Sequence, residues 1–207
     1  MAVITLPSNL LIRAATWGQK RFDLEFGSGD VGSSEVRLLA PSRWLASLAS
    51  PQWLSRADAA VWRDLILSLQ GRVNQLALYD IDNPQPLGTM RGTLTLNGAV
   101  AQWATTISVT GGAGQAGTTL LAGDGIGLGS GATRQVVTVA ANATANGSGV
   151  ISLTIRQPSR WAQSSGTSVV WDKPLALFRQ TTTENTWSRE GQVRTGYSLD
   201  LQESWET

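Results

Sequence analysis

Short runs of hydrophobic residues, separated by turn-forming residues, occupy most of this chain. Near the N-terminus they include VITL (residues 3–6), RFDLEF (21–26) and EVRLLA (35–40), and the turn-like segment GSGDVGSS (27–34) separates the last two. RFDLEF places large apolar residues at alternate positions, with Asp and Glu between them. Because successive side chains of a strand point to opposite faces of its sheet, this alternation predicts a half-buried β-strand.

One segment shows helical periodicity instead. Ser55 stands three residues before Asp58, which is the spacing of a helix-capping pair, and Gly71 supplies a stop signal. Between these signals lies a stripe of apolar residues at helical spacing: Trp62, Leu65, Ile66 and Leu69. We predict a helix over residues 56–70 whose stripe packs on a sheet, and a strand of the same sheet within VNQLALYD (73–80).

The middle of the chain, from about residue 92 to 172, has the composition of β structure throughout. Connections such as GGAGQAG (111–117) and NATANGSG (142–149) are rich in turn formers. They separate five segments rich in β-branched residues: GTLTL (92–96), TTISV (105–109), TRQVVTV (133–139), GVISLTI (149–155) and TSVVW (167–171). Five short strands of this kind predict a small sandwich or barrel.

The C-terminal region returns to the mixed charge of the N-terminal region and carries strand-like runs, LALFRQ (175–180) and GYSLDLQESW (196–205). The simplest fold is therefore mostly β, of the α+β class, in which an antiparallel sheet with one packed helix is interrupted by an inserted small β-sandwich or barrel. We expect residues 1–90 and 174–207 to form the first domain and residues 91–173 to form the inserted one.

Charge is almost absent from the middle region. Between Gly92 and Ile155 the only ionisable side chains are Asp124 and Arg134. Interspersed Lys and Glu normally keep β surfaces soluble and prevent edge-to-edge pairing, so their near absence predicts a segment that is shielded inside an assembly.

The whole chain has 16 Lys and Arg against 15 Asp and Glu, and the basic residues form no run. A nucleic-acid groove needs clustered Lys and Arg, so we expect neither sequence-specific nucleic-acid binding nor recruitment to an anionic membrane.

The N-terminus lacks the basic region of a signal peptide, and no stretch approaches the length of a membrane span. We expect synthesis in the cytoplasm.

Residues that carry common catalytic chemistry are also missing. The chain has no Cys and no His, which excludes disulfides, thiolate chemistry and histidine as a general base or zinc ligand. Lys20 and Lys173 are the only lysines, and neither lies in a recognisable catalytic signature. We expect no enzymatic activity, no cofactor and no metal.

A pair of carboxylates is the nearest approach to a catalytic site. Asp80 and Asp82, in YDIDNPQP, would point to one side of an extended strand, as two acids do in a glycosidase or a hard-cation site. Because Pro84 and Pro86 follow closely, strand exit and turn formation is the favoured interpretation.

Two glycine patterns mimic a nucleotide-binding motif. Gly112, Gly114 and Gly117 fit G-x-G-x-x-G, and a looser form comprises Gly127, Gly129 and Ala132. A dinucleotide site needs a strand before the motif and a helix after it, whereas strand-like segments follow both patterns here. We interpret them as hairpin loops.

The nine tryptophans allow a carbohydrate-binding interpretation, because exposed indoles stack on sugars. Trp103, Trp161 and Trp171 all fall in or beside the middle region, where they could form such a platform. Most Trp side chains are core or interface anchors, so burial or a subunit contact is the favoured role of these three residues.

The order of these features resembles the distal tail protein of long-tailed bacteriophages. The likeness rests on residues 43–80, an aromatic strand, a helix, a Leu-x-Gly stop and a strand, and on the Pro-rich exit at 79–92. It continues through the Ala-Gly-Asp turn, valine strand and Asn/Gly-rich hairpin within residues 118–161. The return strands at 172–191 and the acid-aromatic end at 197–205 complete it.

The resemblance implies a structural virion protein without catalysis. Distal tail proteins assemble into a ring, commonly a hexamer, at the tail tip. The ring would join the tail tube protein and tape-measure protein to the hub proteins, and would hold fibre or receptor-binding proteins. A closed ring repeats one heterologous interface, which can cover an exposed sheet edge of each copy. The alternatives are a carbohydrate-binding adhesion module, a tube or hub subunit, and a cell-wall glycosidase.

Overall fold

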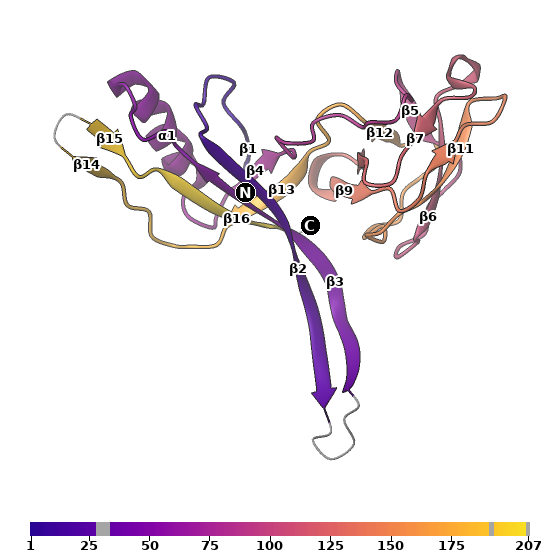
Figure 1. Cartoon of the computed structure of the whole chain (residues 1–207), viewed down its shortest axis with the longest axis horizontal. Coiled ribbons are helices and arrows are strands. Elements are labelled where there is room, and N and C mark those ends of the chain that lie inside the picture. The colour runs from indigo at the N-terminus through magenta and orange to yellow at the C-terminus, as the bar shows by residue number, and fades with distance from the viewer. Residues whose placement is uncertain (28–33, 191–192, 206–207) are drawn as a thin grey trace.

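The computed structural model describes residues 1–27, 34–190 and 193–205. Figure 1 shows a sheet that carries a helix and, beside it, a second β body, with a long hairpin projecting from between them. In the described part of the chain the fold is mostly β, with one α-helix and antiparallel sheets, which confirms the predicted fold class. No described helix is long and apolar enough to cross a membrane.

The first sheet has six strands, in the order β1 (Val3–Thr5), β4 (Gln75–Leu78), β13 (Ala176–Gln180), β16 (Ser198–Glu203), β3 (Ser34–Ala49) and β2 (Ala14–Gly27). β1 runs parallel to β4, and all other neighbours are antiparallel. The helix shares one hydrophobic core with this sheet. A short ladder of β14 (Ser188–Glu190) and β15 (Val193–Thr195) precedes β16.

The helix, α1 (Arg56–Leu69), begins at the predicted residue and ends one residue before the predicted end at residue 70. Ser55 caps it, because its hydroxyl accepts the Asp58 backbone N–H at 3.1 Å. Gln70 and Gly71 then take left-handed conformations, with φ of 49° and 64°, which end the helix. All four residues of the predicted stripe are buried: Trp62, Leu65, Ile66 and Leu69. The strand predicted after the helix is also confirmed as β4.

The second sheet has six strands, in the order β11 (Val150–Thr154), β6 (Thr106–Thr110), β5 (Leu94–Leu96), β12 (Ser168–Val170), β8 (Gly125–Leu128) and β9 (Gln135–Thr138). A bridge between Val139 and Ile155 joins the ends of the two edge strands, β9 and β11. The sheet therefore closes into a small barrel, one of the two predicted architectures, around a core of its own.

Loops of the barrel contain the remaining short elements, β7 (Thr119–Leu120) paired with β10 (Ala143–Thr144), and the 3₁₀ turns Ala113–Gln115 and Gly131–Thr133. The first glycine pattern lies in the loop between β6 and β7, and the second spans the end of β8 and the turn before β9. Neither pattern is followed by an α-helix, so neither has the strand-glycine-helix context of a dinucleotide site.

The two segments that connect the sheet to the barrel lie against each other. The Lys173 backbone N–H donates to the Pro84 carbonyl at 2.7 Å. The Gln85 side-chain amide donates to the Asp172 carboxylate at 2.8 Å. The chain therefore enters and leaves the barrel at one place.

Asp124, one of the two ionisable residues of the charge-poor region, holds the entering segment. Its carboxylate is 1% exposed and accepts the backbone N–H groups of Leu87, Gly88 and Leu121 at 2.7, 3.0 and 2.7 Å. A Cβ at position 88 would lie 2.3 Å from the Thr119 carbonyl oxygen, so only glycine fits this approach. These bonds give the buried carboxylate partners and fix the path into the barrel.

The hairpin of β2 and β3 corrects the prediction for RFDLEF. The predicted runs 21–26 and 35–40 are the outer parts of much longer strands, and they extend beyond the sheet as a two-stranded ribbon (Figure 1). Leu24 and Phe26 are 44% and 52% exposed, so the strand is not half-buried. Alternation gives a strand an apolar face, but it does not provide a layer to cover that face. Residues 28–33 of the predicted turn lie outside the described residues.

Trp62→Ala should lower the free energy of unfolding by about 3–5 kcal/mol, because it empties a fully buried site. It also removes the hydrogen bond from the indole Nε1 to the Leu11 carbonyl, 2.9 Å long. Urea denaturation followed by far-UV circular dichroism measures this loss. Trp53→Ala is the matched control, since Trp53 is largely exposed and its removal should change stability little. Equal effects of the two substitutions would contradict the packing of α1 on the sheet.

Candidate interaction surface

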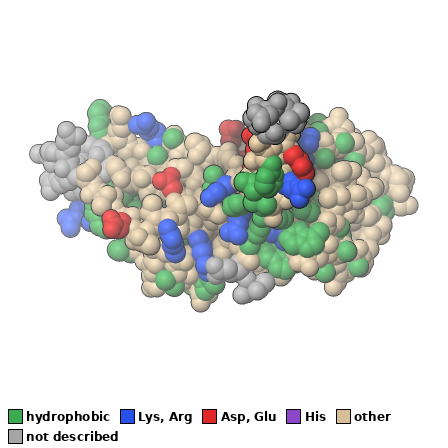
Figure 2. All heavy atoms as spheres, turned by 90° about the horizontal axis from the view of Figure 1, so that it is seen from below, with side chains coloured by type: hydrophobic (Ala, Val, Ile, Leu, Met, Phe, Trp, Pro, Cys, Tyr) green, Lys and Arg blue, Asp and Glu red, His purple; other side chains and the backbone are tan. Residues whose placement is uncertain are grey.

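The outer hairpin, residues 22–27 and 34–40, exposes large apolar side chains: Leu24, Phe26, Val36, Leu38 and Leu39. Leu38 is the most exposed of them, at 69%. Figure 2 views the molecule from below and shows hydrophobic side chains gathered on and beside the projecting hairpin, with charged side chains around them. An isolated two-stranded ribbon is at best marginally stable in water, so this length of bare ribbon is an unusual feature for a free monomer.

Two β-bulges bend the hairpin where it leaves the sheet. The pairing with β2 shifts register between Lys20 and Phe22 and again between Phe22 and Asp23. Both shifts place extra residues in β3, which also contains Pro41 there. Bulges increase local twist and bend a strand, so they aim the outer hairpin away from the sheet.

A groove lies in the angle between this bent base and the barrel, with a volume of about 610 Å³. The hairpin supplies one wall and the segments after β9 and β11 supply the other. Its only charged side chains are Arg21 and Arg156. The remaining lining residues are Gln19, Leu38, Leu39, Ala40, Pro41, Ser42, Ala140, Thr154, Ile155, Gln157 and Pro158.

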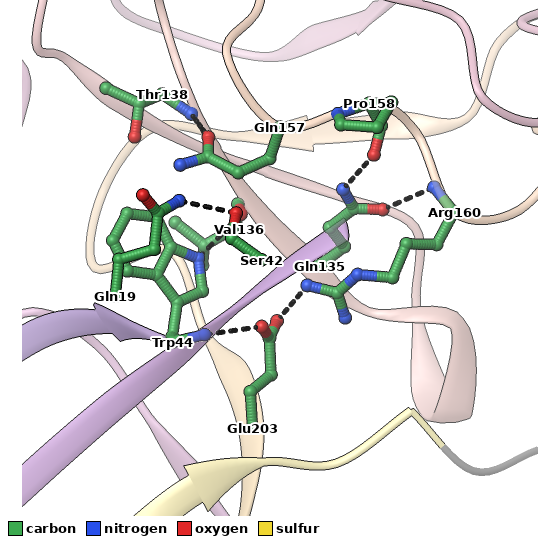
Figure 3. Close-up of polar contacts among 10 residues, drawn as sticks. All are labelled: Gln19, Ser42, Trp44, Gln135, Val136, Thr138, Gln157, Pro158, Arg160 and Glu203. Atoms are coloured by element: carbon green, nitrogen blue, oxygen red, sulfur yellow. Dashed lines mark hydrogen bonds and ion pairs between the residues drawn. The ribbon is translucent and has the colours of Figure 1, made fainter. Parts of the chain in front are cut away.

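A buried ion pair connects the sheet to the barrel (Figure 3). Glu203 of β16 and Arg160, in the loop after β11, are 1% and 4% exposed at their side chains, with Arg160 Nη2 2.5 Å from the carboxylate. Burial lowers the pKa of the Arg160 guanidinium, and the Glu203 charge opposes that shift. The second Glu203 oxygen accepts the Trp44 backbone N–H at 2.9 Å, so one carboxylate binds both the barrel and the base of the hairpin.

Aromatic stacking covers the ion pair. The guanidinium groups of Arg43 and Arg160 lie 4.2 and 4.4 Å from the ring centre of Trp205. Arg43 Nε and Arg160 Nη1 are buried without a hydrogen-bond partner, so the ring face supplies part of their electrostatic stabilisation.

We call the contacts among Trp44, Arg160 and Glu203 the junction. Further hydrogen bonds extend the junction to the groove. The Trp44 indole donates to the Val136 carbonyl at 3.0 Å. The buried Gln135 amide donates to the Pro158 carbonyl at 2.8 Å and accepts the Arg160 backbone N–H at 2.9 Å. Gln157 accepts the Thr138 backbone N–H at 2.8 Å. Since Gln157 and Pro158 also line the groove, the hydrogen bonds of the junction hold part of the groove wall in place.

The three tryptophans proposed for sugar stacking occupy separate environments. Trp103 is half-exposed, Trp171 donates to the Gly92 carbonyl at 2.7 Å beneath Arg91, and Trp161 lies beside Arg160. Among the described aromatic contacts, none joins two of these rings. They do not form a common platform of the kind a sugar-binding surface uses.

Asp80 and Asp82 form a turn. The Asp82 backbone N–H donates to the Asp80 carboxylate at 3.1 Å, as in an Asx-turn. The adjoining cavity measures about 20 Å³, room for about one water molecule and far too small for a sugar ring. In the described part of the chain, no three acidic side chains gather in a metal-binding arrangement.

No protein-family model matches this chain, and no curated protein matches its sequence significantly.

Sequence reasoning did not identify the junction residues Arg160 and Glu203, nor the anchoring role of Asp124. The ion-pair partners are 43 residues apart, so no local pattern links them. Asp124 did stand out as an isolated acid in a charge-poor region, and a lone acid there was a usable sign of a buried hydrogen-bonding role.

Glu203→Ala should destabilise the protein by about 3–5 kcal/mol, because it leaves the Arg160 charge buried without a counter-ion. Adding Arg160→Met should restore much of the loss, since the uncompensated charge is then gone. Glu35→Ala is the matched control: its ion pair with Arg37 is largely exposed and contributes at most about 1 kcal/mol. Denaturation curves for the four proteins test this, and a Glu203→Ala loss no larger than the control would contradict it.

Asp80→Asn should stabilise the protein at neutral pH, because burial raises the pKa of the Asp80 carboxyl. The folded state then favours the protonated form, and stability is lost as pH rises through the folded pKa. The asparagine carbonyl still accepts the Asp82 N–H. Melting temperatures of variant and wild type should converge as pH falls through the raised Asp80 pKa to below the ordinary carboxyl pKa of 3.8, whereas a pH-independent gap would contradict this assignment.

Proposed function

We propose that this protein is a structural subunit of a long-tailed bacteriophage tail tip, a distal tail protein that assembles with copies of itself into a ring. The observation that carries the proposal is the outer hairpin, whose exposed leucine, valine and phenylalanine side chains are suited to burial against another protein. The resemblance of residues 43–205 to distal tail proteins supplies the biological setting.

Closure of the barrel changes part of the reasoning from charge. The edges of a charge-poor open sheet would need a neighbouring subunit to cover them, but β9 and β11 cover each other through the Val139–Ile155 bridge. Low charge in the barrel therefore does not require an assembly. The hairpin, which lies in the more charged region, becomes the main support for self-association.

In this proposal the ring is a hexamer that joins the tail tube protein and the tape-measure protein to the hub, and holds fibre or receptor-binding proteins. Its role is structural and non-catalytic, and its location is the virion. The separate environments of Trp103, Trp161 and Trp171 give the sugar-binding alternative little support. A tube or hub subunit differs from this proposal only in its position along the tail.

Immunogold labelling of intact virions tests the location. Gold should lie at the far end of the tail, at the junction with the fibres. Labelling along the whole tube would identify a tube subunit, and absence of label from the virion would refute the proposal.

Leu38→Asp should abolish self-association while leaving the melting temperature nearly unchanged, because it places a charge on an exposed apolar surface that only a neighbour would bury. Sedimentation velocity and negative-stain microscopy of the purified protein measure this. Leu87→Asp is the matched control, since Leu87 is also largely exposed, at 78%, but lies on the segment leading to the barrel. Equal loss of assembly in both variants would contradict a role for the hairpin.

A further inference from the structure

The two faces of the outer hairpin have different chemistry. The register of β2 and β3 pairs Asp23 with Leu38 and Glu25 with Val36, and paired residues share a face. We name these four residues the front face. The front face is the one that looks toward the groove, because Leu38 belongs to both.

The back face consists of the alternate pairs, Leu24 with Arg37 and Phe26 with Glu35. Both faces expose apolar side chains, Val36 and Leu38 in front and Leu24 and Phe26 behind. Because each strand alternates, the apolar residues of the two faces stand at nearly the same height along the hairpin.

The front face carries two acidic side chains, Asp23 and Glu25, whereas the back face carries one basic and one acidic side chain, Arg37 and Glu35. On the front face, Asp23 and Glu25 make no ion pair within the described residues. On the back face, Arg37 pairs with Leu24. Its position along the hairpin is therefore between the positions of Asp23 and Glu25. Its partner in the chain is Glu35 at 2.9 Å, a largely exposed pair that holds it only weakly.

A closed ring requires two different surfaces of one chain to fit each other. In a ring whose axis runs parallel to the hairpin, rotation leaves the position of each residue along that axis unchanged, and the front face of one copy meets the back face of the next in matching register. Arg37 then approaches Asp23 and Glu25 of the neighbouring copy, and apolar residues meet apolar residues.

We propose that the front face of each hairpin packs against the back face of the hairpin of a second copy of this chain, and that this contact is the repeated interface of the ring. The groove at the foot of the front face receives the base of the neighbouring hairpin. This inference rests on the proposed function for self-assembly, but it does not depend on where in the virion the ring lies.

The absence of cysteine makes a direct test possible. In the double variant Leu24→Cys/Val36→Cys, each copy presents one thiol on the back face and one on the front. The two thiols of one chain point to opposite faces and cannot bridge each other without backbone movement. Mild oxidation should therefore link successive copies, giving a ladder of covalent oligomers on non-reducing gels.

The single variants Leu24→Cys and Val36→Cys should stay uncross-linked, because like faces do not meet in a head-to-tail interface. Leu24→Cys/Leu87→Cys is the matched double control and should also give no ladder. Covalent dimers of a single variant would reveal a two-fold contact and overturn the inference. An unlinked double variant in a protein that still forms rings would also overturn it and leave the proposed function standing.

Charge substitution provides a second measurement. Arg37→Glu should weaken assembly about tenfold, and combining it with Asp23→Lys and Glu25→Lys should restore it by reversing both sides of the contact. Assembly unaffected by Arg37→Glu would overturn the inference, as would a wild-type protein that sediments as a monomer at its highest soluble concentration. A ladder combined with absence of the protein from the tail tip would instead refute only the proposed function.

Discussion

The ion pair between Glu203 and Arg160 is the constraint on which the arrangement of this molecule depends. It joins the C-terminal strand of the sheet to a barrel loop, and the same carboxylate binds the backbone of Trp44 at the foot of the hairpin. Three parts of the chain therefore share one acidic group. Buried charges are costly to desolvate and demand suitable geometry, so such a pair favours one relative placement of its partners over others.

The junction has a second point of attachment at the connecting segments. Asp124 secures the path into the barrel through the backbone N–H groups of Leu87 and Gly88, and the bond between Lys173 and Pro84 brings the returning segment beside it. Two separated attachments resist rotation better than one. Apolar packing adds to these polar contacts, because Val136 of β9 is buried in the hydrophobic core of the sheet, while the barrel has a second core of its own.

The sequence was most informative where the cause of structure is local. A serine cap, an apolar stripe and a glycine stop define α1 without reference to the rest of the chain, and β-branched runs between turns locate most barrel strands. The outer hairpin shows the limit, because alternation in RFDLEF identifies a strand but cannot show that the sheet ends before it. The junction was beyond local reasoning altogether, since Glu203 and Arg160 acquire their role only when distant segments meet.

The placement of Lys173 beside Pro84 has a consequence for how this architecture can vary. A closed barrel whose entry and exit adjoin is attached like a loop inserted at one surface position, where changes of length and content disturb the host fold least. A related chain that exchanged the barrel for another module would keep this attachment, but it would also lose Arg160, the buried partner of Glu203. Diversification of the peripheral body is therefore coupled to a replacement of Glu203 in the scaffold.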